Sequence, residues 1–274
     1  MKTIWNAAKE QEKLTAVLDT YVWGTIAPEF VKSMETITAC AGAEYGLLTF
    51  SVTAALESML RGLNVGAGDE VIVASWSDPV DAMVTAAVGA TPVFADVCAP
   101  DYVLTAEAVA ACKNANSRAV IADLSVAGTA TLPALAAYCK EAGLYLFLNA
   151  GDALGARVNG EPLTRYVDAA FVDMGAGTQL DVGLAGAVVT DKRELWDLFY
   201  AYHNCGRTFG EGCTLAPDEI IGGDLRVAEW QAAILNVRLE QEKAAVITEP
   251  KRVYMPDQPF FADPYFAKLT GKTV

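Results

Sequence analysis

Histidine and closely spaced cysteines are nearly absent from this sequence of 274 residues. It has one histidine, His203, and none of its six cysteines forms a C-x-x-C pair. Zinc sites in proteins draw on histidine and cysteine side chains at short spacings, so the sequence does not predict a metal site. The isolated His203 is better explained as a structural residue of a predicted helix at 194–204 than as a catalytic one.

Basic residues are also scarce. The chain has 20 Lys and Arg against 34 Asp and Glu, a net charge of −14. A surface this acidic repels phosphate backbones and anionic lipid, which argues against nucleic acid and membranes as partners. No apolar run is long enough to span a bilayer, and charges interrupt the first 13 residues where a signal peptide needs an apolar core. We expect a cytoplasmic protein.

Hydrophobic residues, by contrast, make up 53% of the chain, which is ample for a large core. Short runs of β-branched residues alternate with amphipathic stretches, a pattern that predicts the α/β class with a mainly parallel sheet covered by helices. The predicted strands are residues 46–50, 70–74, 91–95, 119–122, 144–148, 169–172 and 185–189. The predicted helices between many of them include residues 53–63, 80–88, 106–113 and 132–141.

The composition changes near the end of the chain, where four prolines and five aromatic residues crowd residues 250–266. This predicts a large domain with an N-terminal helical segment at residues 1–242 and an extended tail at 243–274. Two arrangements of the tail stay open. It packs on its own domain, or it wraps around another chain.

Several ordered sequence blocks carry a resemblance to a known family. They read FSVTAAL (50–56), NVGAGDEVIV (64–73), VGATPVFADV (88–97), NAGDALGA (149–156) and GGDLRVAEWQAA (222–233). In this order they resemble the DegT/DnrJ/EryC1/StrS sugar aminotransferases, which use pyridoxal phosphate. The resemblance implies an aspartate-aminotransferase-like fold (fold type I) with the large cofactor-binding domain, and a small C-terminal domain that is reduced or absent.

The segment that anchors the cofactor in that family resembles residues 171–190, FVDMGAGTQLDVGLAGAVVT. Counting back from the GAVVT strand, the lysine that forms the Schiff base falls on Thr178, or on Gln179 if the loop is one residue shorter. Neither side chain can form an imine. The sequence has no lysine between Lys140 and Lys192, so a small shift in register cannot supply one.

Other cofactor positions implied by the resemblance also depart from the family. The aspartate that protonates the pyridine nitrogen falls on Asn149, and the stacking aromatic residue falls on Asp78 unless Trp76 reaches in. Two acids near the phosphate would each cost about 4 kcal/mol, against about 8 kcal/mol for micromolar binding. We therefore expect a vestigial pocket without cofactor. Its residues are Val52, Thr53, Asp78, Asn149, Asp152, Asp173, Thr178, Asp224 and Arg226.

The acids allow a second interpretation. Asp78, Asp152, Asp173 and Asp224 map around the cleft, with Asp123 near a neighbouring strand end, and could attract a cation or an amine. Alternatively they are solvated surface acids or are paired with basic side chains such as Arg226.

Three function classes follow. The first is a catalytically degenerate pseudoenzyme that acts as a structural or regulatory partner. The second is a lysine-independent enzyme acting on a nucleotide sugar or related ketone, and the third is a small-ligand or cation-binding module that uses the acidic cleft. Because the family builds its site across a dimer interface, and apolar residues occur at 21–28 and 206–226, we expect a homodimer or a heterodimer with an active relative.

Overall fold

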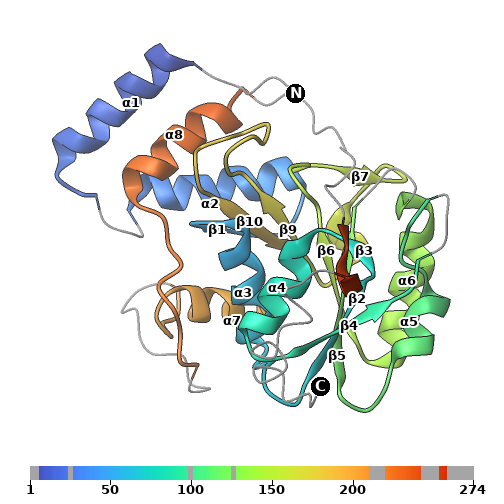
Figure 1. Ribbon diagram of the computed structural model, residues 1–274. Helices are drawn as coiled ribbons and strands as arrows, with labels where there is room; N and C mark the ends of the chain where they lie inside the picture. Colours follow the sequence, from blue (N-terminus) through green and yellow to red (C-terminus); the bar gives the residue numbers. More distant parts are fainter. Residues whose placement is uncertain are drawn as a thin grey trace.

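A seven-stranded sheet forms the centre of the protein (Figure 1). The computed structural model describes residues 6–23, 27–97, 101–124, 128–209, 220–241 and 253–257. The strand order is β1-β10-β9-β6-β5-β2-β4. The strands are β1 (Tyr45–Thr49), β2 (Glu70–Ala74), β4 (Thr91–Ala95), β5 (Ser117–Asp123), β6 (Tyr145–Asn149), β9 (Ala169–Asp173) and β10 (Gly186–Thr190).

Most of the sheet is parallel, which confirms the predicted fold class. The five strands from β4 to β9 run in one direction, whereas β10 is antiparallel to both of its neighbours, β9 and β1. Parallel strands bring their carboxyl ends to one edge of the sheet, where ligand sites of α/β proteins are usually found.

Helices cover the sheet on both sides. α3 packs on β9, β10, α4 and α7, whereas α5 and α6 pack on each other and on β4 and β6. Figure 1 shows these two groups on opposite sides of the sheet, with α1, α2 and α8 together beside β1. The helices are α1 (Ala7–Thr20), α2 (Pro28–Ala41), α3 (Val52–Gly62), α4 (Pro79–Ala87), α5 (Ala106–Cys112), α6 (Gly128–Ala142), α7 (Arg193–His203) and α8 (Glu229–Leu239).

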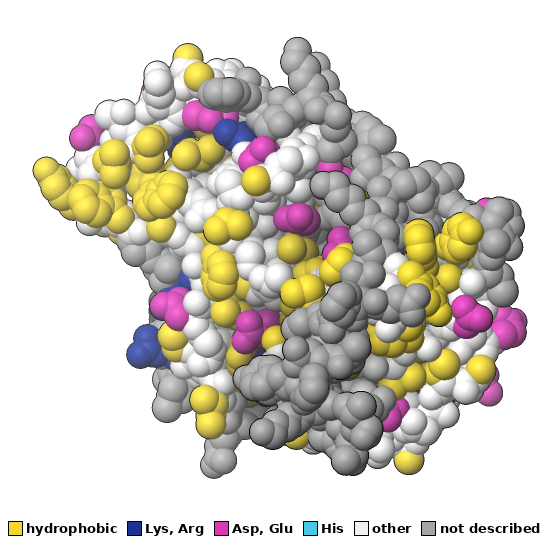
Figure 2. All heavy atoms as spheres, in the orientation of Figure 1, with side chains coloured by type: hydrophobic (Ala, Val, Ile, Leu, Met, Phe, Trp, Pro, Cys, Tyr) yellow, Lys and Arg dark blue, Asp and Glu magenta, His cyan; other side chains and the backbone are white. Residues whose placement is uncertain are grey.

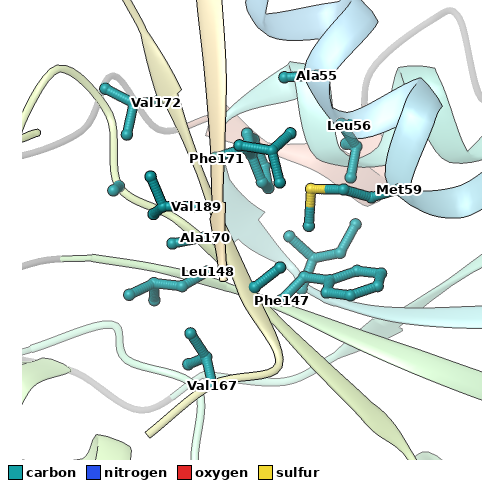
Figure 3. Close-up of a cluster of buried hydrophobic side chains, with 14 of the residues drawn as sticks. Ala55, Leu56, Met59, Phe147, Leu148, Val167, Ala170, Phe171, Val172 and Val189 are labelled. Carbon is teal, nitrogen blue, oxygen red and sulfur yellow. The ribbon is translucent and has the colours of Figure 1, made fainter. Parts of the chain in front are cut away.

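The core between α3 and the sheet is built from large apolar side chains. Leu56 and Met59 of α3 lie against Phe147 and Phe171 of the central strands, and all four are fully buried (Figure 3). Burying each such side chain contributes roughly 1.5–3 kcal/mol. This packing fixes α3 against the strands whose ends carry the candidate site.

The described part of the C-terminal tail packs on its own domain. Strand β11 (Val253–Tyr254) pairs antiparallel with the short strand β3 (Trp76–Ser77), directly after β2. Met255 opens the 3-10 turn η2 (Met255–Asp257), donates its N–H to the Ser75 carbonyl at 2.8 Å, and is buried. Most of the predicted tail lies outside the described residues, so the division at residue 242 stays a prediction.

The remaining short elements lie between β6 and β9. They are the hairpin of β7 (Arg157–Val158) and β8 (Glu161–Pro162) and the 3-10 turn η1 (Leu163–Arg165). Among the helices in the described ranges, none combines the length and the apolar character needed to cross a bilayer.

Candidate functional site

The predicted site residues gather at the carboxyl edge of the sheet. Asp123 at the end of β5 is in register with Asn149 at the end of β6, and Asp173 at the end of β9 is in register with Gly186 at the start of β10. Gly186 in turn pairs with Thr49 of β1, just before α3 begins. The carboxyl ends of β5, β6, β9 and β1 and the start of β10 therefore lie at one edge of the sheet.

Thr178 lies in a tight turn that its own hydroxyl stabilises. The side chain is buried, its Oγ1 donates to the Gly175 carbonyl at 2.7 Å, and it accepts the Asp181 N–H at 3.0 Å. The neighbouring Gln179 is half-buried and donates its backbone N–H to Asp152 at 3.3 Å. The position that the family resemblance assigns to the lysine is thus a structural threonine that closes a loop.

Asn149 is held by a carboxyl group that the sequence reasoning missed. Its Nδ2 donates to Asp81 Oδ1 at 2.9 Å, and its Oδ1 accepts the Gly151 N–H at 3.0 Å. Asp81 lies in the first turn of α4 and is completely buried. The sequence signal was an acid within the apolar stretch PVDAMVTAA, on the face of the helix that packs inward.

The surroundings of the Asp81 carboxyl disfavour its charged form. Burial raises its pKa well above the ordinary value, and the adjacent carboxylates of Asp123 and Asp78 raise it further. No N–H donor of the described residues reaches Asp81 Oδ2, and Asp123 is the neighbouring carboxyl that can share a proton with it. The amide at position 149 therefore has a buried acid directly behind it.

Asp78 and Trp76 do not provide an aromatic platform. Asp78 caps α4, since its Oδ1 accepts the Val80 N–H at 2.9 Å. The Trp76 ring packs against Tyr102, which follows β4, with ring centres 5.6 Å apart. The Trp76 ring is therefore engaged by a residue that follows the edge strand β4.

The start of α3 forms a polar cradle. Ser51 caps the helix by accepting the Ala54 N–H at 3.1 Å, and its hydroxyl lies 2.7 Å from that of Thr53. A Cβ at Gly186 would lie 2.5 Å from the Ser51 carbonyl, so only glycine allows β10 to pass this closely. Val52 is half-buried and packs toward the core.

The remaining acids are engaged by donors. Asp173 Oδ1 accepts the Gly175 N–H at 2.8 Å, and Asp224 forms an ion pair with Arg226 at 2.7 Å. The Arg226 guanidinium lowers the pKa of Asp224. No group of three or more potential ligands in the described ranges is arranged to hold a metal ion. The strongly electronegative cation site considered from the sequence finds no support in this arrangement.

His203 is a core residue, as expected from the sequence. It is fully buried, stacks on Phe30 with ring centres 5.9 Å apart, and also contacts Tyr200. Burial lowers its pKa to about 3, so the imidazole is neutral.

Known proteins give a consistent comparison. The chain matches the DegT/DnrJ/EryC1/StrS aminotransferase family over residues 6–260. It is 30% identical to 3-amino-5-hydroxybenzoate synthase of Amycolatopsis mediterranei (strain S699), over 88% of this chain and 63% of that protein. It is 28% identical to a pleiotropic regulatory protein of Geobacillus stearothermophilus, over 78% of this chain and 56% of that protein.

A solved structure gives the same result. The crystal structure of 3-amino-5-hydroxybenzoic acid synthase superposes with a TM-score of 0.78 at 26% identity, covering 88% of this chain and 63% of that one. The chain spans between 46% and 63% of the length of the curated relatives it matches. The predicted fold type I architecture is confirmed.

The expectation of a pocket without cofactor is wrong. The matched family and its structural neighbours are pyridoxal-phosphate-dependent aminotransferases, so pyridoxal phosphate is the cofactor to expect here. The electrostatic argument failed because it treated each acid as an unpaired charge facing the phosphate. Asp173 accepts a backbone N–H and Asp224 is neutralised by Arg226, which reduces the repulsion that was counted against binding.

The described residues fit a non-covalently held cofactor. The hydroxyls of Ser51 and Thr53 and the N-terminus of α3 suit a phosphate, since helix N-termini favour anions. Asn149, held in place by its contact with Asp81, offers a neutral hydrogen-bonding group to a ring nitrogen. Thr178 does not fit the covalent attachment, because it carries no amine.

Proposed function

Because the chain belongs to the DegT/DnrJ/EryC1/StrS aminotransferase family, we propose that it is a lysine-deficient member that does not transaminate and acts as a structural or regulatory partner. One observation carries this proposal. The Thr178 hydroxyl is buried, and it both donates and accepts a hydrogen bond within the turn at residues 175–181. Its side chain therefore stabilises the loop and offers no nucleophile.

Pyridoxal phosphate, when bound, supplies the electron sink for amino-group transfer. In this chain, Ser51 and Thr53 at the start of α3 would hold the phosphate end. Asn149, held by Asp81, would orient the ring end. Transfer also needs a base that moves a proton at the reacting carbon, a role for which Thr178 is unsuited at neutral pH.

The regulatory form of the proposal is supported by one relative. The Geobacillus stearothermophilus protein is described as a pleiotropic regulatory protein although it shares the family scaffold with this chain. The comparisons do not favour a lysine-independent enzyme, because the relatives named for a reaction include inosose and sugar aminotransferases.

A dimer is part of the proposal. The end of α1 exposes Tyr21 (82%) and Trp23 (48%), which stack with ring centres 6.0 Å apart, together with Leu18 and Val22. Figure 2 shows hydrophobic side chains gathered over this end of α1. Exposed apolar groups in contact with one another favour association. Two other residues expected at the interface, Ile26 and Leu215, lie outside the described residues.

A cytoplasmic location completes the proposal. It is supported by Cys112, Cys139 and Cys205, which form no disulfide in the described part of the chain, as is usual in a reducing compartment.

Borohydride trapping tests the central claim. Purified protein is incubated with pyridoxal phosphate and L-glutamine, reduced with sodium borohydride and analysed by peptide mass spectrometry. We expect cofactor to be recovered intact, no lysine adduct and no conversion to pyridoxamine phosphate. T178K should give an adduct at that position without turnover, because the uncharged Asn149 does not hold a proton on the ring nitrogen. T15K on exposed α1 serves as control. A specific adduct or amino transfer by the unmodified chain would refute the proposal.

Light scattering tests the association. We expect a dimer at micromolar concentration, weakened by Y21S/W23S but not by Y102S, which removes an exposed aromatic ring elsewhere. A monomer, with no partner chain recovered from the native source, would contradict the partner role.

A further inference from the structure

A cavity of about 460 Å³ opens at the opposite edge of the sheet from the candidate cofactor residues. It lies between the end of α6, the turn η1 and the beginnings of β6, β9 and α7. Its walls include the apolar side chains of Ala136, Leu144, Leu146 and Val167. This volume is within the range of small-molecule pockets, roughly 300–1,000 Å³.

Positive charge concentrates around this cavity. Lys140, Arg165 and Lys192 line it, against a single acid, Asp168. In a chain with a net charge of −14, three of 20 basic side chains at one cavity is an unusual concentration. The surroundings of the cavity are therefore electropositive while the protein as a whole is acidic.

The acid at this cavity is already used. Asp168 Oδ2 accepts the Leu146 N–H at 2.6 Å, and Oδ1 forms an ion pair with Lys192. Arg165 lies 3.7 Å from Asp191 at an exposed position, a weak pair. No ion pair within the described residues engages Lys140. Two cations thus remain largely available to a ligand.

A buried hydroxyl points to the same conclusion. Thr164 also lines the cavity, is only 7% exposed, and its Oγ1 has no hydrogen-bond partner among the described residues. A buried polar group without a partner costs roughly 1–3 kcal/mol, so native structures rarely leave one. A ligand oxygen in the cavity would satisfy this hydroxyl.

We propose that this cavity binds a small organic anion. Its carboxylate or phosphate group pairs with Lys140 and Arg165 and accepts the Thr164 hydroxyl, while its apolar body lies against Leu144 and Leu146. The adjacent Cys139 offers no thiolate to a ligand at neutral pH, because burial and the Asp168 charge raise the pKa of its thiol to about 12. The site is independent of the cofactor cleft and of the proposed function.

Calorimetric titration with matched probes tests the proposal. Phenyl phosphate and phenylacetate carry the two anionic groups on a similar apolar body, and benzyl alcohol is the neutral control. We expect at least one anion to bind tenfold or more tightly than benzyl alcohol, and the stronger of the two identifies the head group. Equal affinity for all three probes, or no binding, would overturn the proposal.

Two variants locate the site. K140Q/R165Q should weaken binding of the preferred anion at least tenfold, whereas K113Q/R118Q removes the same charge elsewhere and should leave it unchanged. T164V should weaken binding several-fold without lowering the thermal midpoint of the free protein, since the hydroxyl it removes is unpartnered. Equal effects of the two double variants would show that net charge alone is responsible and would contradict the proposed site. Normal binding by T164V would show that the Thr164 hydroxyl does not contact the ligand.

Discussion

The buried Asp81 should make the protein less stable as pH rises, and D81N should relieve this. The amide keeps an oxygen for the Asn149 Nδ2 contact and gains N–H donors toward Asp123. In the native state the pKa of Asp81 is raised, so that state binds more protons than the unfolded chain above about pH 3.8. The contribution of Asp81 to the free energy of unfolding is therefore largest at low pH. It falls as pH rises from about 3.8 to the native pKa.

The magnitude follows from the size of the pKa shift. At a pH above the native pKa, each unit by which the pKa of Asp81 is raised lowers the free energy of unfolding by about 1.4 kcal/mol. This corresponds to a loss of roughly 3–5 °C in melting temperature for a chain of this size. The N-terminal turn of α4 favours a negative charge at Asp81 by about 0.3–1 kcal/mol, a smaller effect of opposite sign. D81N should therefore be more stable than the parent protein at pH 8.

Urea unfolding at pH 4, 6 and 8 measures the effect. We expect the two proteins to be nearly equal at pH 4, with an advantage for D81N that grows with pH. D101N, an acid-to-amide change at an exposed position, should show no such divergence. A D81N protein that is less stable at pH 8, or a difference independent of pH, would show that Asp81 is ionised in the native state and that the burial argument is wrong.

Three further substitutions test the framework around the site. Glu229 is buried and caps α2 by accepting its first two N–H groups at 2.6 and 3.0 Å, so E229Q should cost about 1–2 kcal/mol in urea unfolding. Arg238 donates two hydrogen bonds to Glu10, and both side chains are largely buried. R238M should therefore lower the free energy of unfolding by roughly 3 kcal/mol, and E10M/R238M should recover most of this loss in the same assay. Burial lowers the pKa of His203 to about 3, so the contribution of this residue to the free energy of unfolding should fall by about 1.4 kcal/mol per unit as pH drops below 6.5. The stability of the parent protein relative to H203F should therefore decrease with this slope between pH 6 and 4, and a difference that does not change with pH would contradict the reasoning.

The local pattern was sufficient to predict the parallel strands. The runs at 70–74 and 91–95 coincide with β2 and β4, because continuous apolar segments between turns are typical of strands buried on both faces. The pairing of β11 with β3 was not predicted, since two-residue strands nearly 180 residues apart leave no periodic signal.

The candidate site was predicted in part. Family resemblance led to Asn149, Asp173 and Thr178, which the structure places at the ends of β6 and β9 and in the turn after β9. Asp81 was missed because its role depends on a contact across 68 residues with Asn149. The charge balance of the cleft was misjudged for the same reason, since sequence shows an acid but not the N–H group that it accepts.

The edge position of β1 has a consequence for synthesis on the ribosome. Within the described residues, β1 pairs only with β10, and Thr49 meets Gly186 after about 140 further residues, which takes roughly 7–28 s at typical translation rates. During that interval Leu47 and Leu48, both buried in the final fold, have no sheet to join. The nascent chain thus carries an unpaired apolar strand throughout this interval, in which chaperones and premature self-association compete for it.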